Sequence, residues 1–152
     1  AGSEGELVLT HLDRECQPLA RFRTGDLIQL TATDRCACGR GAPRFRVIGR
    51  TDEMIVVRGV NAFPSAVAAA VNACPELNGE YRIRLAHPPP YDRLPLEAEL
   101  LQDQAPNDDL CDTIRQRLAD TLRLGVALTL LPSGTLERTE GKTRRLIKDY
   151  RQ

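Results

Sequence analysis

The order of apolar patterns along residues 53–131 restricts the fold of this chain more than any other feature. A short β-branched run at 54–57 predicts a strand. A helical pattern follows, which begins near Pro64 and ends before Pro75. Proline suits the first turn of a helix, and the residue before a proline disfavours helical angles. We therefore expect one helix between these two prolines, with Asn61 or Ser65 as its cap.

Two alternating polar and apolar runs, at 81–87 and 95–101, predict two strands that each bury one face. A second helical pattern at 105–125 separates them from a last apolar run at 126–132. The order is therefore strand, helix, strand, strand, helix, strand. It predicts an α+β domain of the βαββαβ (ferredoxin-like) type, with two helices on one face of a sheet. This fold alone indicates no function.

The second helix carries the strongest periodicity of the chain. Four apolar residues lie four positions apart and share one face: Leu110, Ile114, Leu118 and Leu122. We expect Asp108 near the positive N-terminal end of this helix and Gly125 as its C-terminal cap.

Residues 1–48 differ from this regular region. Two strand-like runs, at 5–13 and 20–30, have a proline-containing connection between them, and a glycine-rich stretch at 33–44 predicts a loop or tight hairpin. We interpret this part as the last β-rich piece of a larger domain whose remainder is absent. Gly49 to Asp52 lies between two apolar runs and predicts a linker or hinge.

Composition excludes several partners. With 21 acidic and 21 basic residues the net charge is zero, and the chain has no Trp, which argues against a nucleic-acid partner. No stretch reaches the roughly 20 apolar residues of a membrane span, so we expect no membrane partner. Five cysteines at irregular spacings indicate reduced thiols and a cytoplasmic location.

Three short segments carry the most specific signal: RFRTGD at 21–26, GRTDEMIVVRGVNAFP at 49–64, and EGKTRRLIKD at 140–149. In this order they resemble the adenylate-forming acyl-CoA ligase superfamily. RGVNAFPS after GRTDEM is most similar to the phenylacetate-CoA ligase branch. The resemblance covers nearly the whole chain. It implies a piece of the large adenylation domain at 1–49, a hinge at 50–52, and a mobile C-terminal domain at 53–152.

The resemblance also implies a reaction in two steps. A small carboxylic acid, here expected to be an aryl acid, attacks ATP with Mg²⁺ and gives acyl-AMP. The thiol of coenzyme A then takes the acyl group and AMP leaves, while the C-terminal domain rotates between the steps. The phosphate loop and acyl pocket of such enzymes belong to the large N-terminal adenylation domain, a necessary partner that is missing here. We therefore expect this chain alone to be inactive.

Four residues match functional positions of that superfamily in the first two segments. Asp26 matches the acid that accepts hydrogen bonds from the ribose hydroxyls, and Arg50 matches a nucleotide-binding arginine. Asp52 matches the hinge residue. Gly59 matches the position that lines the tunnel for the pantetheine arm, where the absence of a Cβ leaves room.

Lys142 matches the catalytic lysine of the adenylation step. A compact ammonium on a flexible stem can bridge a bound carboxylate and the α-phosphate, and so stabilise the transition state. Lys148, the other lysine of the chain, is interpreted as a solvated cation. Gly141 and Lys142 do not belong to a phosphate-binding loop of the Gly-x4-Gly-Lys type, because position 136 is Leu.

Cys36 and Cys38 are candidate zinc ligands, although a structural zinc site takes four. Cys16 and His11 are further candidates, and the missing region is another source of ligands. Zinc is therefore a secondary prediction and no metal ligand is assigned. Cys74 and Cys111 fall in helical patterns and are expected to be small core residues.

Other interpretations stay open on the sequence. The thiol acceptor could be the phosphopantetheine arm of a carrier protein instead of free coenzyme A. A ligand-binding βαββαβ module without chemistry explains the fold but not the three ordered segments. An RNA-binding module of this topology needs stacking aromatics, whereas the strand at 81–87 offers Arg82 and Arg84.

Overall fold

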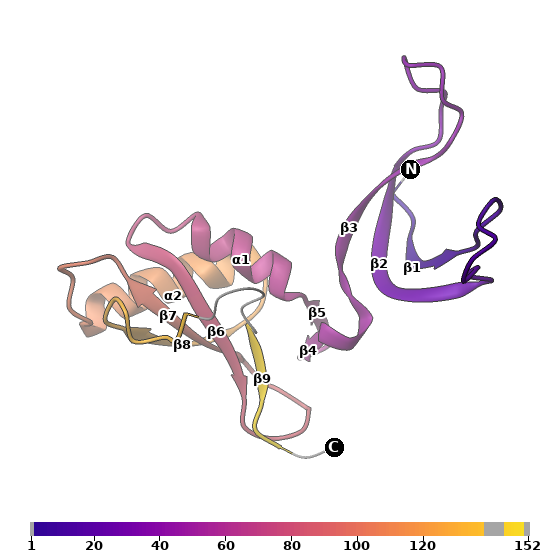
Figure 1. Ribbon diagram of the computed structural model, residues 1–152. Helices are drawn as coiled ribbons and strands as arrows, with labels where there is room; N and C mark the ends of the chain where they lie inside the picture. Colours follow the sequence, from indigo (N-terminus) through magenta and orange to yellow (C-terminus); the bar gives the residue numbers. More distant parts are fainter. Residues whose placement is uncertain (1, 139–144, 151–152) are drawn as a thin grey trace. The chain divides into compact units, whose positions relative to one another are not determined.

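The computed structural model describes residues 2–138 and 145–150. The chain divides into two compact units, residues 1–54 and 55–152, which we call unit 1 and unit 2 and describe separately (Figure 1). Among the described residues, no helix is long and apolar enough to cross a membrane.

Unit 1 is a three-stranded antiparallel sheet in the order β1-β2-β3. Its strands are β1 (Glu4–Leu9), β2 (Phe22–Ala32) and β3 (Arg44–Arg50), and a single 3₁₀ turn, η1 (Thr51–Glu53), follows them. The sequence predicted two strands and a loop here; the stretch after the loop forms the third. No described residue of unit 1 is fully buried, and Phe22, Phe45 and Val47 are about half exposed.

Unit 2 is built on a four-stranded sheet in the order β8-β7-β6-β9. The two central strands, β6 (Leu77–Leu85) and β7 (Leu94–Leu100), are antiparallel. The edge strands run parallel to their neighbours: β8 (Val126–Leu131) to β7, and β9 (Leu146–Lys148) to β6.

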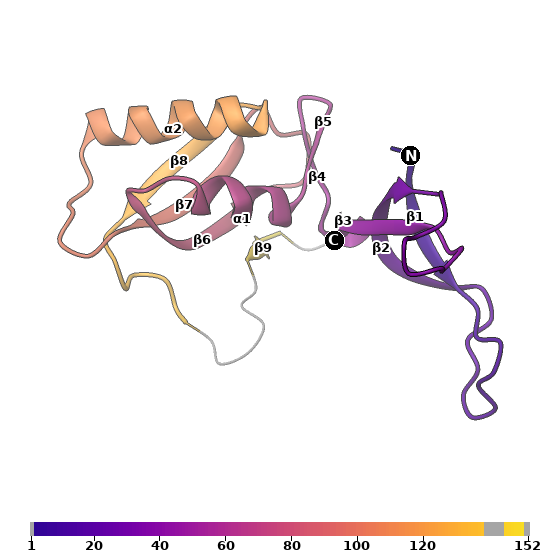
Figure 2. The same cartoon turned by 90° about the horizontal axis from the view of Figure 1, so that it is seen from above.

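Two helices cover one face of this sheet, α1 (Pro64–Asn72) and α2 (Asp108–Leu122) (Figure 2). Ile114 and Leu118 of α2 are fully buried, while Leu110 and Leu122 pack against the same core, so the predicted apolar face is confirmed. The apolar core lies between helices and sheet and includes Val67, Val71, Ile83 and Leu96. The α+β class is confirmed.

One strand takes a different place from the expected βαββαβ arrangement. The run after Met54 forms β4 (Ile55–Val57), which pairs with β5 (Val60–Ala62) in a separate hairpin, and β9 supplies the fourth strand of the main sheet. The reason is local: the turn at Arg58 and Gly59, both with positive φ, returns the chain along β4, so β4 pairs with β5.

The ends of the helices differ in detail from the prediction. Pro64 is the first residue of α1, as predicted, and the N-cap position before it is Phe63, whose side chain makes no capping hydrogen bond. The side chain of Asn107 caps α2 by accepting from the Leu110 N–H. Arg123, with φ of 56°, takes the left-handed position at the C-terminal end, which replaces the expected cap at Gly125.

Candidate functional site

Three of the predicted site residues meet at one end of the sheet of unit 1. Asp26 on β2 lies opposite Arg50, the last residue of β3, in the antiparallel register. The Arg50 guanidinium donates from Nη1 to Asp26 Oδ1 at 3.1 Å and from Nε to Asp52 Oδ1 at 3.0 Å. One arginine therefore joins both predicted carboxylates, across a strand pair and into η1.

Gly25 makes this arrangement possible for two reasons. Its φ is +75°, a region that L-residues with a side chain rarely adopt. A Cβ at this position would also lie 3.1 Å from Nη2 of Arg50. In addition, its carbonyl accepts a hydrogen bond from the Thr51 hydroxyl at 3.3 Å. Glycine at position 25 of the RTGD segment thus leaves the space that the Arg50 guanidinium occupies.

The side chains of this cluster are partly exposed and keep unused hydrogen-bond acceptors, so a ligand can reach them. Hydrogen bonding to Asp52, with further attraction from Asp26, raises the pKa of the Arg50 guanidinium. The Arg50 and Asp26 side chains are 44% and 32% exposed. Arg50 uses one carboxylate oxygen of Asp26, and a carboxylate has about four acceptor positions. Asp26 can therefore accept hydrogen bonds from hydroxyl groups of a ligand, and the Arg50 guanidinium is held beside it.

Gly59 forms the turn of the β4–β5 hairpin in unit 2. Arg58 and Gly59 have φ of 47° and 83°, and they connect the paired residues Val57 and Val60. Two central residues with positive φ are the geometry of a tight hairpin turn. No heavy atom lies within 4 Å of a Cβ built at Gly59, so the turn is open there.

The loop after β6 holds this hairpin turn in place. The Arg58 N–H donates to the Tyr91 carbonyl at 3.0 Å, and Val57 bridges to Tyr91 as a short parallel pair. The Arg58 guanidinium also lies 3.8 Å from Asp92. Sequence reasoning did not connect Gly59 to this loop, because the two are about thirty residues apart.

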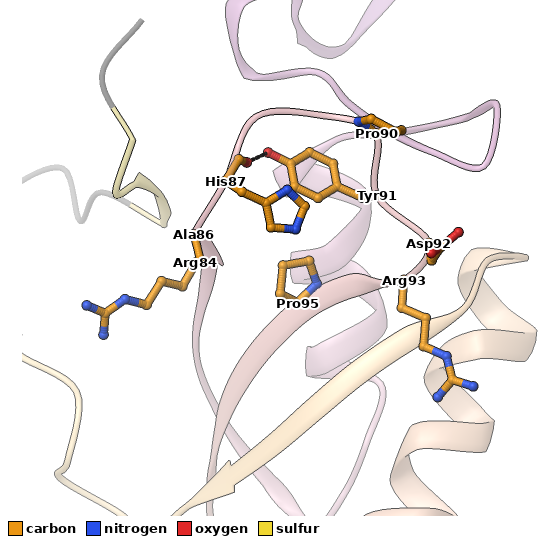
Figure 3. A pocket seen from close by; sticks show the side chains of 8 residues that line it. All are labelled: Arg84, Ala86, His87, Pro90, Tyr91, Asp92, Arg93 and Pro95. Atoms are coloured by element: carbon orange, nitrogen blue, oxygen red, sulfur yellow. Dashed lines mark hydrogen bonds between the residues drawn. The ribbon is translucent and has the colours of Figure 1, made fainter.

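A pocket of about 350 Å³ lies along this loop (Figure 3). The Tyr91 hydroxyl donates to the His87 carbonyl at 2.5 Å, and the two rings lie 5.1 Å apart. Burial, and then the neighbouring Tyr150 hydroxyl, raise the pKa of Tyr91. Arg84 and Arg93 extend on opposite sides of the pocket. Its eight lining residues are Arg84, Ala86, His87, Pro90, Tyr91, Asp92, Arg93 and Pro95.

The sequence predicted only a turn for the stretch that forms this pocket. The sequence feature that could have indicated the pocket is the run of three prolines at 88–90, which has His87 before it and Tyr91 after it. Proline fixes the local backbone and so can hold two flanking rings together.

With this geometry in place, one comparison decides the family. The family described as AMP-binding enzyme C-terminal domain matches residues 59–151. The chain belongs to this family.

Curated relatives of this member of the AMP-binding enzyme C-terminal domain family are phenylacetate-coenzyme A ligases. The protein of that name from Thermus thermophilus is 34% identical over 169 residues, which is 99% of this chain and 38% of the relative. The chain spans about a third of the length of the curated relatives it matches.

Solved structures of 2-hydroxyisobutyryl-CoA ligase match the chain in two states. The structure in the postadenylation state with R3-HIB-AMP has a TM-score of 0.85, with 32% identity over 97% of this chain and 32% of the other. The structure with 2-HIB-AMP and CoA in the thioesterification state matches the same shares at the same identity, with a TM-score of 0.54.

The other predicted site residues of this family member have no described site geometry. Lys142 lies outside the described residues, and Lys148 lies in β9. Cys36 and Cys38 lie in the loop after β2 as free thiols, and hydrogen bonding from Cys38 lowers the pKa of Cys36. Among the described residues, no group of three or more His, Cys, Asp or Glu side chains could hold a metal ion. Zinc at this pair stays a prediction.

Proposed function

We propose that the protein to which this chain belongs is an ATP-dependent acid–thiol ligase of the cytoplasm. It activates a small carboxylic acid, of the aryl type, as acyl-AMP and transfers the acyl group to coenzyme A. The observation that carries this proposal is the joining of Asp26 and Asp52 by Arg50, in a family member whose three motif segments stand in the expected order. The names of the curated relatives support the acid class and the acceptor.

In this proposal Asp26 and Arg50 bind the nucleotide. The Asp26 carboxylate accepts from the ribose hydroxyls, since Arg50 occupies only its Oδ1. Arg50 is held by Asp26 and Asp52 before a ligand arrives, so it needs little reorganisation to face an oxygen of the nucleotide. ATP with Mg²⁺ supplies the activated phosphate, and no ligand of the magnesium is assigned to this chain.

Lys142 is the catalytic residue of the first step. Negative charge builds where the carboxylate meets the α-phosphate, and a point-charge ammonium stabilises it. The role rests on the position of Lys142 in its sequence segment, as the residue is outside the described part of the chain. Removal of one such group commonly lowers a rate on the order of 10²–10³-fold.

Asp52 is proposed as the hinge between the large adenylation domain, which includes residues 1–49, and the mobile domain at 53–152. Support comes from its place in η1, directly before the boundary of the two units at Met54 and Ile55. Two structures of one relative give a second support, because its postadenylation and thioesterification states match this chain with different TM-scores at the same coverage. A short polar side chain in a turn tolerates several backbone states.

Gly59 is proposed to line the path of the thiol arm. The open space around its Cβ position and the rigid turn that presents it support this role. Free coenzyme A is the proposed acceptor, and a carrier-protein arm is the alternative, because both end in the same thiol. The partner that completes the site is the large adenylation domain. The half-exposed Phe22, Phe45 and Val47 of unit 1 offer the rest of that domain an apolar contact surface.

The test is Lys142→Ala in the whole protein, with each half-reaction measured alone. ATP–pyrophosphate exchange reports the first step, with the best acid from a panel that includes phenylacetate and 2-hydroxyisobutyrate. Thioester formation from synthetic acyl-AMP and coenzyme A reports the second. We expect exchange to fall on the order of 10²–10³-fold, with thioester formation largely retained.

Lys148→Ala is the matched control, because it removes the other lysine of the same terminal stretch. It should leave pyrophosphate exchange close to the parent value. Equal loss of both half-reactions in Lys142→Ala contradicts the assignment. Absence of exchange with every acid in the parent protein overturns the proposed function itself. If thioester forms only when a carrier protein is added, the acceptor is the carrier-protein arm and not free coenzyme A.

A further inference from the structure

Glu99 is the one charged residue that is fully buried within the described ranges 2–138 and 145–150. It is the next-to-last residue of β7. A carboxylate loses much hydration free energy when it is buried, and it stays ionised only where strong donors surround it. Its position therefore needs an explanation that apolar packing does not give.

The donors around Glu99 come mainly from the turn after β8. Oε1 accepts from the Leu136 N–H at 2.5 Å, and Oε2 accepts from the Gly134 N–H at 3.0 Å. The Asn78 amide donates to Oε2 at 2.8 Å, and the Arg138 guanidinium lies 3.9 Å away. One side chain thus fixes two backbone groups of the chain that leaves β8.

The turn itself is well defined. Gly134 has φ of +84°, and the Thr135 hydroxyl donates to the Pro132 carbonyl at 2.7 Å. The Asn78 amide also reaches the Ser133 hydroxyl at 3.3 Å. Leu136 is buried beside them. These contacts therefore fix the chain as far as about residue 138, which in the sequence comes shortly before Lys142.

The chain is fixed again directly after that segment. Arg145 donates to Glu80 Oε2 at 2.6 Å and to the Tyr81 carbonyl at 3.1 Å, and its guanidinium lies over the Tyr81 ring. Its own carbonyl accepts from the Ile83 N–H at 2.8 Å. Glu80 and Ile83 belong to β6, the direct neighbour of β7. Both flanks of the lysine segment are thus held on two adjacent strands.

We propose that Glu99 is a positioning residue for the adenylation step, which it serves by fixing the chain that leads to Lys142. The inference rests on the proposed function of Lys142. The buried carboxylate fixes the Gly134 and Leu136 N–H groups, so we expect its loss to misplace the lysine that follows them in the sequence. A misplacement of about 1 Å can lower a rate on the order of 10²-fold. The thioester step does not use Lys142 and therefore does not depend on Glu99.

The experiment is Glu99→Gln in the whole protein. The amide keeps the shape of the side chain, but its NH₂ group cannot accept from a backbone N–H. We expect pyrophosphate exchange to lose about 10- to 100-fold in kcat with little change in KM for ATP. Thioester formation from synthetic acyl-AMP should stay within about twofold, which a general loss of folding would not allow.

Glu97→Gln is the matched control on the same strand. Glu97 pairs with Arg82 at 2.6 Å and contacts β6 rather than the turn after β8. It should leave both half-reactions close to the parent. Should Glu99→Gln fail to fold, Asn78→Ala removes one donor of the same carboxylate and should give a smaller loss in exchange alone.

The outcomes separate this inference from the proposed function. Selective loss of exchange in both Lys142→Ala and Glu99→Gln supports the two together. If Lys142→Ala loses exchange while Glu99→Gln keeps it, or loses both half-reactions equally, the positioning role is wrong and the ligase proposal stands. If Lys142→Ala keeps exchange, the proposed function fails first.

Discussion

The two units keep their shape by different means. Unit 2 buries an apolar core between one sheet and two helices, whereas no described residue of unit 1 is fully buried. Unit 1 instead holds its end cluster by the Arg50 ion pairs and by the backbone of Gly25. From this difference we expect that unit 2 folds by itself and that unit 1 needs apolar contacts from the rest of the whole protein. Its site residues are accordingly exposed.

The largest contrast should come from one substitution made in each unit. Leu118→Ala removes a fully buried side chain of α2 and should lower the free energy of unfolding of unit 2 by about 2–5 kcal/mol. Leu12→Ala removes a side chain of unit 1 that is 91% exposed. It should change the free energy of unfolding of unit 2 by less than about 0.5 kcal/mol. All three tyrosines lie in unit 2, so tyrosine fluorescence during urea unfolding reports this unit alone.

Similar losses in the two variants would break the comparison, since Leu12 lies outside the unit that tyrosine fluorescence reports. A tyrosine signal that responds to both would also show that the two units unfold together.

An intermediate effect is expected from acid, and it should be confined to unit 2. Burial raises the pKa of Glu99, but the hydrogen bonds from Asn78, Leu136 and Gly134 lower it by more, so the pKa lies below its ordinary value of 4.5. A carboxylate with a lowered folded-state pKa stabilises the fold above the unfolded-state pKa. That contribution is lost as the pH falls through the folded-state value.

The measurement is urea unfolding of the parent and of Glu99→Gln between pH 7 and pH 3, again by tyrosine fluorescence. At pH 7 the variant should be less stable by about 1–3 kcal/mol, because one of the two backbone donors, Gly134 N–H or Leu136 N–H, loses its acceptor. The gap should narrow below pH 4.5. A gap that is constant with pH would mean that Glu99 has the same pKa in the folded and the unfolded state, which contradicts the lowered pKa.

The smallest effects should come from the two positive-φ glycines of the candidate site. Gly25→Ala and Gly59→Ala each place a side chain in the left-handed region, which costs about 1 kcal/mol. Only the new methyl at Gly25 also meets the Arg50 guanidinium. We expect Gly25→Ala to slow pyrophosphate exchange about tenfold, which corresponds to about 1.4 kcal/mol.

Gly59→Ala should instead slow thioester formation and leave exchange close to the parent. The same half-reactions in the whole protein measure both variants. Equal effects on both steps from either glycine would contradict the separate roles given to the two units.

The local patterns of unit 2 were predictable, and the long-range pairings were not. The four-residue spacing around Leu118 predicted α2 and its buried face, because that face is set by the helix period alone. The hairpin at Arg58 was missed, since arginine seldom takes positive φ; contacts with Tyr91 and Asp92 stabilise it. β9 was missed because its three residues gain their partner strand only in the folded domain.

The candidate site divides in the same way. Asp26, Arg50 and Asp52 could be named from motif order, and the structure brings these three together at one sheet end. Glu99 could not be found, because the alternation of β7 places it with Glu97 on the face that a pattern predicts to be exposed. It is buried by the turn after β8, which a strand pattern cannot show.

The parallel pairing of β9 with β6 has a consequence for the order of folding. Ile83 and Leu146 pair across roughly sixty intervening residues, whereas β6 and β7 are joined by one short loop. Closing a long loop costs more chain entropy than closing a short one. We therefore expect β9 to dock last, onto a sheet that is already formed. The C-terminal side of the lysine segment would then be anchored only in the final stage of folding.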